Sequence, residues 1–456
     1  MRLILVLLLV PASIVCASLS AGDWPTYNHD ASRSGVADET LTVPLTEAWI
    51  HTPPNPPQPA WPRPAKADFW HNLSRLEARV IYDRAFHVAV AGESLFYGSS
   101  ADDRVACLDV RTGSERWSFV TDGPVRLAPF VSEGRVYAGS DDGSIYCLDA
   151  GGGGLLWTRN PSGIDRCVIG NGRMISAAPV RTGVIVVDGI AYCCAGIFPK
   201  EGVFLAAYDA LSGENLWRTK PDLSPQGYML ASASRLYLPT GRTAPMAFNR
   251  SDGAALGAIK GSVGAYALVT EDLVVTGPGN KGELGLSAAP GRDHLATFPG
   301  LRMIIDGSIA YLHSKTALSA FDRTRYVALL GERRGLSARV AEIEKQLNAL
   351  GKEAGAGKGK KLKAELDDLR SAIAARTAAM QECTLWQAPC AHPYALILAG
   401  DLLVAGGEES IAAFGTADGK QLWTGTVPGR VYGLAVAGGR LFASSDTGSI
   451  HCFRAE

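Results

Sequence analysis

Two adjacent cysteines, Cys193 and Cys194, are the residues whose types and spacing first suggest chemistry. Neighbouring cysteines can close a strained ring, a vicinal disulfide, which is accommodated more readily in a loop than in a paired strand. The surrounding stretch, "GIAYCCAGIFPKEGVF", offers one carboxylate, that of Glu201. A redox site and a pair of small buried thiols are both open interpretations. We favour buried thiols, because the pair falls at small-residue positions of a predicted strand.

Four arginines could bind an anion, because guanidinium groups hold carboxylates and phosphates through paired hydrogen bonds, and an Asp and an Asn beside them could orient them. Most of them lie in the long connection "IDRCVIGNGRMISAAPVRTG", and one ends the stretch "YLPTGR". These candidate ligand-binding residues are Arg166, Arg173, Arg181, Arg242, Asp165 and Asn171. Long connections on a rigid scaffold are where binding sites concentrate. The same arginines could instead tie loops to backbone carbonyls, so binding and structural interpretations both stand.

Other residue patterns narrow the chemistry. Cys383 and Cys390 flank a predicted strand and are our candidate for an ordinary disulfide. The histidines lie far apart without metal-ligand spacing, so no metal site is predicted. The chain has 44 Lys and Arg against 45 Asp and Glu, with a net charge of -1. Nucleic-acid binding needs a clustered excess of basic residues, so a nucleic-acid partner is not expected.

The N-terminus, "MRLILVLLLVPASIVCASLSAGDW", is typical of a secretory signal, and we predict a signal peptide over residues 1–21. Its apolar run is too short to cross a bilayer. A lipid anchor at Cys16 is not expected, because the preceding Val15 is bulkier than lipoprotein signals usually carry. We therefore expect an exported protein, periplasmic or extracellular, without a transmembrane span after signal removal.

A repeat organises the remaining chain and must position all these residues. The series Tyr97, Val105, Cys107, Asp109 and Trp117 returns forty positions later, without a gap, as Tyr137, Ile145, Cys147, Asp149 and Trp157. Eight copies can be traced, and a complete copy has four strands separated by turns rich in Gly, Ser and Asp. This period predicts an all-β fold, an eight-bladed β-propeller of four-stranded antiparallel blades, over residues 22–456.

The final copy ends before its tryptophan strand, and the N-terminal "LTEAWI", which contains Trp49, can supply that strand. We therefore predict that the N-terminal strand closes the ring, which removes two exposed edges. The repeated tryptophan is predicted to pack against the neighbouring blade. Cys107, Cys147 and Cys452 share one repeat position and are expected to be buried and free.

Residues 325–383 break the repeat. Apolar residues from Leu336 to Leu350, and again from Leu362 to Ile373, are spaced alternately by three and four. This spacing predicts an α-helical coiled-coil hairpin inserted into the sixth blade. The hairpin could be a solvated ornament or a docking arm, and both interpretations are open.

The motif D-x-x-x-G-x-x-x-W and the opening "DWPTYNHDASRSG" resemble the pyrroloquinoline-quinone-like (PQQ-like) propeller repeat of a secreted bacterial, planctomycete-type group. Quinoprotein dehydrogenases and the outer-membrane assembly lipoprotein, which binds proteins, share this fold. In the dehydrogenases, adjacent cysteines lie against the quinone among Asp, Glu and Asn residues that hold calcium. No matching calcium set can be identified in this sequence. The resemblance thus implies the fold strongly and the chemistry weakly.

From these patterns we expect a secreted propeller that acts as a non-catalytic binding or scaffold module, without a cofactor. Its partner would be a protein or a small anionic ligand. The alternative is a PQQ-binding quinoprotein oxidoreductase, which would need calcium with the quinone and would give the adjacent cysteines a redox role.

Overall fold

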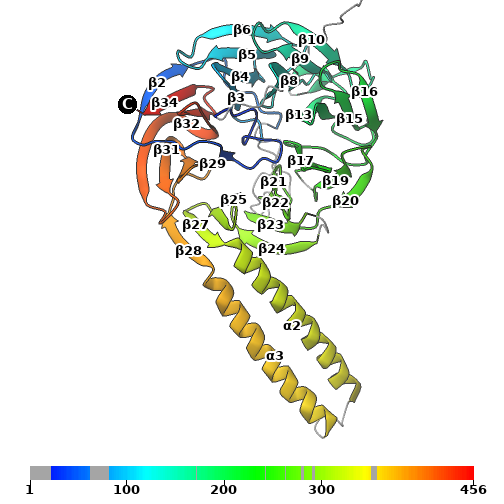
Figure 1. Ribbon diagram of the computed structural model, residues 1–456. Helices are drawn as coiled ribbons and strands as arrows, with labels where there is room; N and C mark the ends of the chain where they lie inside the picture. The colour runs from blue at the N-terminus through cyan, green and yellow to red at the C-terminus, as the bar shows by residue number, and fades with distance from the viewer. Residues whose placement is uncertain are drawn as a thin grey trace, which may run out of the picture.

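The computed structural model describes residues 22–61, 82–170, 172–241, 243–261, 263–278, 282–289, 293–350 and 357–455. The predicted signal peptide with Cys16, and the candidate residues Asn171 and Arg242, lie outside these ranges. The described chain forms eight four-stranded antiparallel blades around a central channel (Figure 1). The predicted eight-bladed propeller is therefore confirmed.

The first four blades each use four consecutive strands, which follow one another from the channel to the rim. Blade one contains β3 (Val88–Ala91), β4 (Ser94–Ser99), β5 (Arg104–Asp109) and β6 (Glu115–Val120). Blade two contains β7 (Phe130–Ser132), β8 (Arg135–Gly139), β9 (Ile145–Asp149) and β10 (Leu155–Arg159). Blade three contains β13 (Val180–Val187), β14 (Ile190–Ala195), β15 (Phe204–Asp209) and β16 (Asn215–Thr219). Blade four contains β17 (Leu230–Ala231), β18 (Arg235–Leu238), β19 (Met246–Asn249) and β20 (Ala255–Ala258).

The remaining blades continue the ring, and the last two share a strand. Blade five contains β21 (Tyr266–Val269), β22 (Leu273–Gly277), β23 (Glu283–Ala288) and β24 (His294–Pro299). Blade six contains β25 (Arg302–Asp306), β26 (Ile309–His313), β27 (Ala317–Asp322) and β28 (Thr384–Pro389). Blade seven contains β29 (Ala395–Ala399), β30 (Leu402–Gly406), β31 (Glu408–Gly415) and the first part of β32 (Gln421–Ala437). Blade eight contains the rest of β32, β33 (Arg440–Ser445), β34 (Ile450–Ala455) and β2 (Leu45–His51).

The ring closes through β2, as the sequence predicted. This strand pairs antiparallel with β34, from Leu45 opposite Ala455 to His51 opposite Ile450. An N-terminal strand therefore completes the blade that the C-terminal strands begin, so the outer edge of β34 is covered.

Tryptophans join successive blades, which confirms the structural role predicted for them. The indole N–H of Trp117 donates to the backbone oxygen of Ala150 at 3.1 Å, and that of Trp157 donates to Ala210 at 3.1 Å. Each ring lies against a positive-φ glycine of the next blade, so that a Cβ on Gly153 would lie 2.6 Å from the Trp117 ring. Only glycine allows both this backbone conformation and this close approach.

The N-terminal residues 22–37, here called the channel strap, run across the inner strands of the propeller. Its backbone is hydrogen-bonded to the inner regions of blades one, two, four, five and seven, through Val90, Val131, Ala231, Val269 and Leu398. The short strand β1 (Val36–Ala37) pairs parallel with β29. Arg33 is 1% exposed and donates to the backbone oxygen of Met229 at 2.9 Å. Because the inner strands line the channel, a segment that contacts five of them must lie across it.

Two helices leave blade six between β27 and β28, at the predicted place. Helix α2 (Arg323–Leu350) and helix α3 (Lys358–Gln381) form an antiparallel hairpin that projects outward from the rim (Figure 1). Ile343, Leu362 and Leu366 are buried between them. At the base, Leu330 and Met380 pack with the apolar side chains of blades five and six. Within the described ranges, no helix has the length and apolarity needed to cross a membrane.

Candidate functional site

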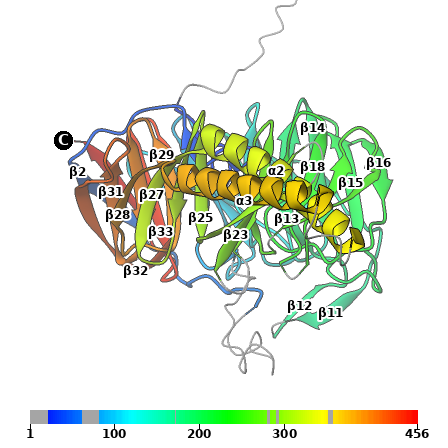
Figure 2. The same ribbon diagram turned by 90° about the horizontal axis from the view of Figure 1, so that it is seen from below.

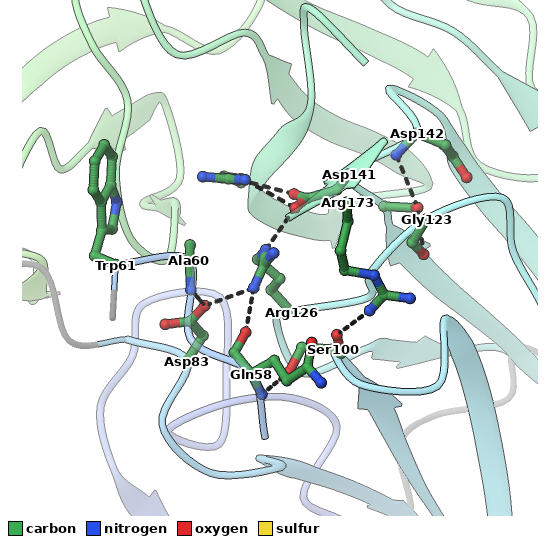
Figure 3. Close-up of polar contacts among 12 residues, drawn as sticks. Gln58, Ala60, Trp61, Asp83, Ser100, Gly123, Arg126, Asp141, Asp142 and Arg173 are labelled. Carbon is green, nitrogen blue, oxygen red and sulfur yellow. Dashed lines mark hydrogen bonds and ion pairs between the residues drawn. The ribbon is translucent and has the colours of Figure 1, made fainter. Parts of the chain in front are cut away.

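Four buried charged residues form a compact cluster, here called the Arg126 cluster (Figure 3). Arg126 Nε donates to Asp141 Oδ2 at 2.6 Å, and its Nη1 lies 3.3 Å from Asp83 Oδ2. Arg181 binds the same Asp141 carboxylate in bidentate fashion, through Nε at 2.8 Å and Nη2 at 2.9 Å. Two guanidinium groups thus face two carboxylates, and the formal charges of the four groups cancel.

The segment between β2 and blade one meets this cluster. Asp83 Oδ2 accepts a hydrogen bond from the backbone N–H of Ala60 at 2.7 Å, and Arg126 Nη1 donates to the backbone oxygen of Gln58 at 2.5 Å. Trp61 and Tyr82 both donate to the side-chain oxygen of Gln226, in the connection that leads into blade four. The cluster therefore anchors a chain segment that returns from the rim toward the first blade.

The electrostatics of the cluster depend on this pairing. Burial alone would raise the pKa of Asp141, but the charges of Arg181 and Arg126, and the hydrogen bonds they donate, hold it below its ordinary value. Burial raises the pKa of Asp83, against the opposing charge of Arg126. Asp141 is thus the fixed anion that both arginines share, which is an arrangement suited to holding structure together.

The sequence-predicted arginines are not gathered around one empty centre. Arg181 belongs to the Arg126 cluster. Arg173 donates to the backbone oxygens of Ser100 and Ala101, at 2.9 and 3.2 Å, and pairs with the Asp103 carboxylate. Arg166 is exposed and pairs with Glu201.

Asp103 feels the charges of both Arg173 and Arg126. Burial raises the pKa of the Asp103 carboxyl, and these two positive charges oppose that rise, so Asp103 couples Arg173 to the Arg126 cluster. Asp165 is exposed beside Arg166. Each described candidate arginine therefore has a carboxylate partner within the chain. This pattern favours the loop-tying interpretation and leaves anion binding as a prediction.

Cys193 and Cys194 are free and fully buried, so the candidate vicinal disulfide is not formed. They lie within β14, which pairs on both sides, with β13 and with β15. Thr182 Oγ1 accepts a hydrogen bond from the Cys194 backbone N–H at 3.1 Å. Burial raises the pKa of both thiols. A cysteine ring that contacts a quinone needs side-chain surface accessible to the cofactor, and both of these side chains are 0% exposed, so they do not fit that contact.

The candidate disulfide between Cys383 and Cys390 is not formed, because both thiols are free. They lie just before and just after the six residues of β28. An extended strand of that length holds its ends about 20 Å apart, far beyond disulfide reach. Instead, Cys390 Sγ lies 3.6 Å from His313 Nε2 in the blade interior. Cys107, Cys147 and Cys452 are buried and free, as predicted.

Sequence reasoning missed a small exposed sheet, here called the apolar hairpin. It consists of β11 (Cys167–Gly170) and β12 (Arg173–Ser176), which pair with each other and lie beyond one face of the propeller (Figure 2). Ile169 and Met174 are cross-strand neighbours, exposed to 82% and 60%. The signal that could have revealed it is the dipeptide Asn-Gly between two apolar runs, a strong hairpin indication. The same sequence was interpreted as a long connection.

The fold relates the chain to known proteins. A family model described as outer membrane protein assembly factor BamB matches residues 65–189 and 371–456, less than half of the chain. A comparison with curated protein sequences gives no match.

Several solved structures are similar at low sequence identity. BamB from Moraxella catarrhalis has 11% identity and a TM-score of 0.53, covering 90% of this chain and 100% of that chain. Quinohemoprotein alcohol dehydrogenase from Comamonas testosteroni has 13% identity and a TM-score of 0.59, covering 96% and 81%. The computationally designed Ika8 protein has 12% identity and a TM-score of 0.55, covering 83% and 98%. The chain is therefore a β-propeller, similar in fold to BamB and to quinoprotein dehydrogenases, and two stretches of it match the BamB family model.

Proposed function

We propose that the chain is an exported, non-catalytic propeller that binds an extended segment of a partner protein at the apolar hairpin. The observation that carries this proposal is the exposure of Ile169 and Met174, side by side on a two-stranded sheet. Apolar side chains exposed together on a protein surface are characteristic of interaction sites. The proposal of export rests on the signal-like N-terminal sequence.

The occupant is inferred from the backbone of the hairpin. β11 and β12 pair with each other and with no further strand of the described chain, so the outer edge of β11 is open, whereas β12 is bonded at its base through Ser176 N–H to Asp141 O. An extended partner segment can add to such an edge, with main-chain hydrogen bonds supplying affinity and alternate side chains supplying specificity. Val168 is 39% exposed on the edge strand, and Ile169 follows it. A partner strand would therefore find apolar contacts beside its backbone pairing.

The hairpin is also held in place, which makes it a suitable platform. Arg173, in β12, ties it to the loop of blade one through Ser100 and Ala101. Ile175 and Ser176 are buried at its base. A preordered platform loses less conformational entropy when it binds than a mobile loop does.

Site-specific photocrosslinking in the producing cells tests this function. We expect Ile169→p-benzoylphenylalanine to give a discrete protein adduct that disappears when Met174→Asp is added. The matched control is Val120→p-benzoylphenylalanine, because Val120 is 71% exposed on the rim strand β6. The proposal fails if position 169 gives no adduct, or if both positions give the same adducts.

The quinone alternative has its own test. We expect calorimetric titration of pyrroloquinoline quinone with calcium to give no saturable heat, because both adjacent thiols are enclosed within blade three. Saturable binding that is lost in Cys193→Ser/Cys194→Ser would contradict the non-catalytic assignment. The chain would then be a quinone-binding oxidoreductase.

A further inference from the structure

We propose that the free end of the α2–α3 hairpin docks electrostatically on an anionic lipid bilayer. Five exposed lysines gather there, here called the lysine tip: Lys345, Lys358, Lys360, Lys361 and Lys363. Clusters of this size bind anionic lipid headgroups, and each lysine near such a surface strengthens binding about fivefold. The chain as a whole has a net charge of -1, so this tip is a local feature and not a consequence of overall charge.

The charges of the hairpin change character along its length. Arginines pair across the two helices with glutamates: Arg376 with Glu332 toward the propeller, and Arg370 with Glu344 and Arg339 with Glu365 beside the lysine tip. These pairs stabilise the coiled coil itself. At the tip, the structure records no carboxylate of the described residues paired with the five lysines. Their ammonium groups are therefore available to an external anion.

The start of α3 makes the tip still more electropositive. The first turn of α3 contains no acidic residue, and its N-cap, Gly357, provides no side-chain cap. Lys358, Lys360 and Lys361 thus lie at the positive end of the helix dipole, where basic residues are unfavourable within the isolated chain. An anionic surface opposes both the lysine charges and the dipole, so docking would relieve this repulsion.

The arrangement of the lysines selects a flat surface. Successive residues of a helix are rotated by about 100°, so positions 358, 360, 361 and 363 point to different sides of α3. A protein groove would contact one side of the helix, whereas a plane met end-on is reached by all of them. Large apolar side chains are not exposed on the described part of the hairpin. The contact would therefore be electrostatic and sensitive to salt, without insertion into the bilayer.

The base of the hairpin gives the tip a defined position. Arg334 donates to the backbone oxygens of His294 and Leu295 in blade five, at 2.7 and 2.6 Å. Helix α2 has 28 residues and so extends about 42 Å. Figure 1 shows the pair projecting away from the disc. The propeller would then stand off from the membrane by a fixed distance, with its faces accessible to partners.

Vesicle co-sedimentation of the full mature chain tests this proposal. The vesicles are phosphatidylcholine with about one-third phosphatidylglycerol, compared with phosphatidylcholine alone. The tip variant is Lys358→Gln/Lys360→Gln/Lys361→Gln/Lys363→Gln. The matched control, Lys200→Gln/Lys220→Gln/Lys260→Gln/Lys420→Gln, removes the same charge from the propeller. We expect the wild type and control to bind anionic vesicles at low salt, and the tip variant to bind at least about tenfold more weakly.

Three results would overturn the proposal: equal binding by the tip variant, equal binding to neutral vesicles, or no binding of the wild type to anionic vesicles. A wild type that binds heparin or an acidic protein, but not the vesicles, would assign the tip to a soluble polyanion instead. Circular dichroism checks that the helical content of both variants is unchanged. The photocrosslink at the apolar hairpin is independent of these results, so failure of one proposal leaves the other standing.

Discussion

Single glycines control how closely neighbouring blades approach, and Gly153 offers the sharpest test. Its φ is +71°, and an added Cβ would lie 2.6 Å from the Trp117 ring. We expect Gly153→Ala to lower the free energy of unfolding by about 2–4 kcal/mol, because backbone strain and the clash with the ring add. Urea unfolding followed by tryptophan fluorescence measures this change.

Gly134→Ala is the matched control for this prediction. Gly134 has nearly the same φ, +72°, but nothing lies within 4 Å of the position of its Cβ. It should cost only the backbone term, about 1–2 kcal/mol. Equal losses in the two variants would show that the approach of the tryptophan ring contributes nothing to stability.

A buried histidine, His313, makes the stability of the fold depend on pH. Burial, aided by the positive charges of Arg302 and His392, lowers its pKa to about 3. The unfolded chain takes up a proton on His313 near pH 6.5 and the folded chain does not. The free energy of unfolding therefore falls as the pH drops below about 6.5. His313→Gln cannot protonate. We expect the loss of unfolding free energy between about pH 7 and pH 4.5 to be about 2 kcal/mol smaller in this variant than in the wild type.

Parallel pH profiles of the two proteins in urea would contradict this prediction.

The contact between His313 and Cys390 was not predicted from the sequence, because the two residues are 77 positions apart and come together only across blade six. Tyr97, Trp117 and Cys107 were placed correctly, since their roles repeat from blade to blade. Single contacts outside the repeat carry no such periodic signal.

Among the elements, the helical hairpin divides into a structural base and a distal arm. Leu330 and Met380 pack into blades five and six, whereas Ile343, Leu362 and Leu366 contact only the other helix and its neighbours. We expect replacement of residues 337–374 by a short Gly-Ser turn to leave the melting temperature of the propeller within about 2 °C of the wild type. Calorimetry measures this transition.

Deletion of residues 324–382 should lower the melting temperature clearly, since it also exposes Phe298 and Phe321 at the base. If the shorter deletion lowers the melting temperature as much as the longer one, the distal arm itself stabilises the propeller. The comparison also separates stability from the membrane docking proposed for the lysine tip.

The elements show where pattern recognition succeeded and where it stopped. Seven predicted seam residues, among them Val340 and Leu369, do form the helical interface, because their spacing follows the helix period. The apolar hairpin was missed because its two short strands lie outside the repeat. The Arg126 cluster joins Asp83, Arg126, Asp141 and Arg181, which come from four separate stretches of the chain. Only the assembled ring brings these charges together.

At the scale of the whole molecule, the N-terminal segment both crosses the channel and closes the ring, so the propeller should behave as an assembly of two pieces. The indole of Trp423 donates to the backbone oxygen of Leu45, and that of Trp49 donates to Val110 in blade one. A chain that begins at residue 52 would lose these links, and the edge of β34 would be open. We expect this shortened chain to melt at a lower temperature and to aggregate.

Adding a peptide of residues 22–51 should raise the melting temperature in proportion to the logarithm of its concentration, because a ligand that binds only the folded state stabilises it by mass action. A control peptide with Thr46→Pro and Ile50→Pro cannot pair fully with β34 and should have little effect. The opposite outcome is that the shortened chain closes its ring without β2. If it melts as the full chain does, the closing strand is dispensable. If the peptide restores the full transition, the eight-bladed ring depends on a non-covalent joint between the two ends of one chain.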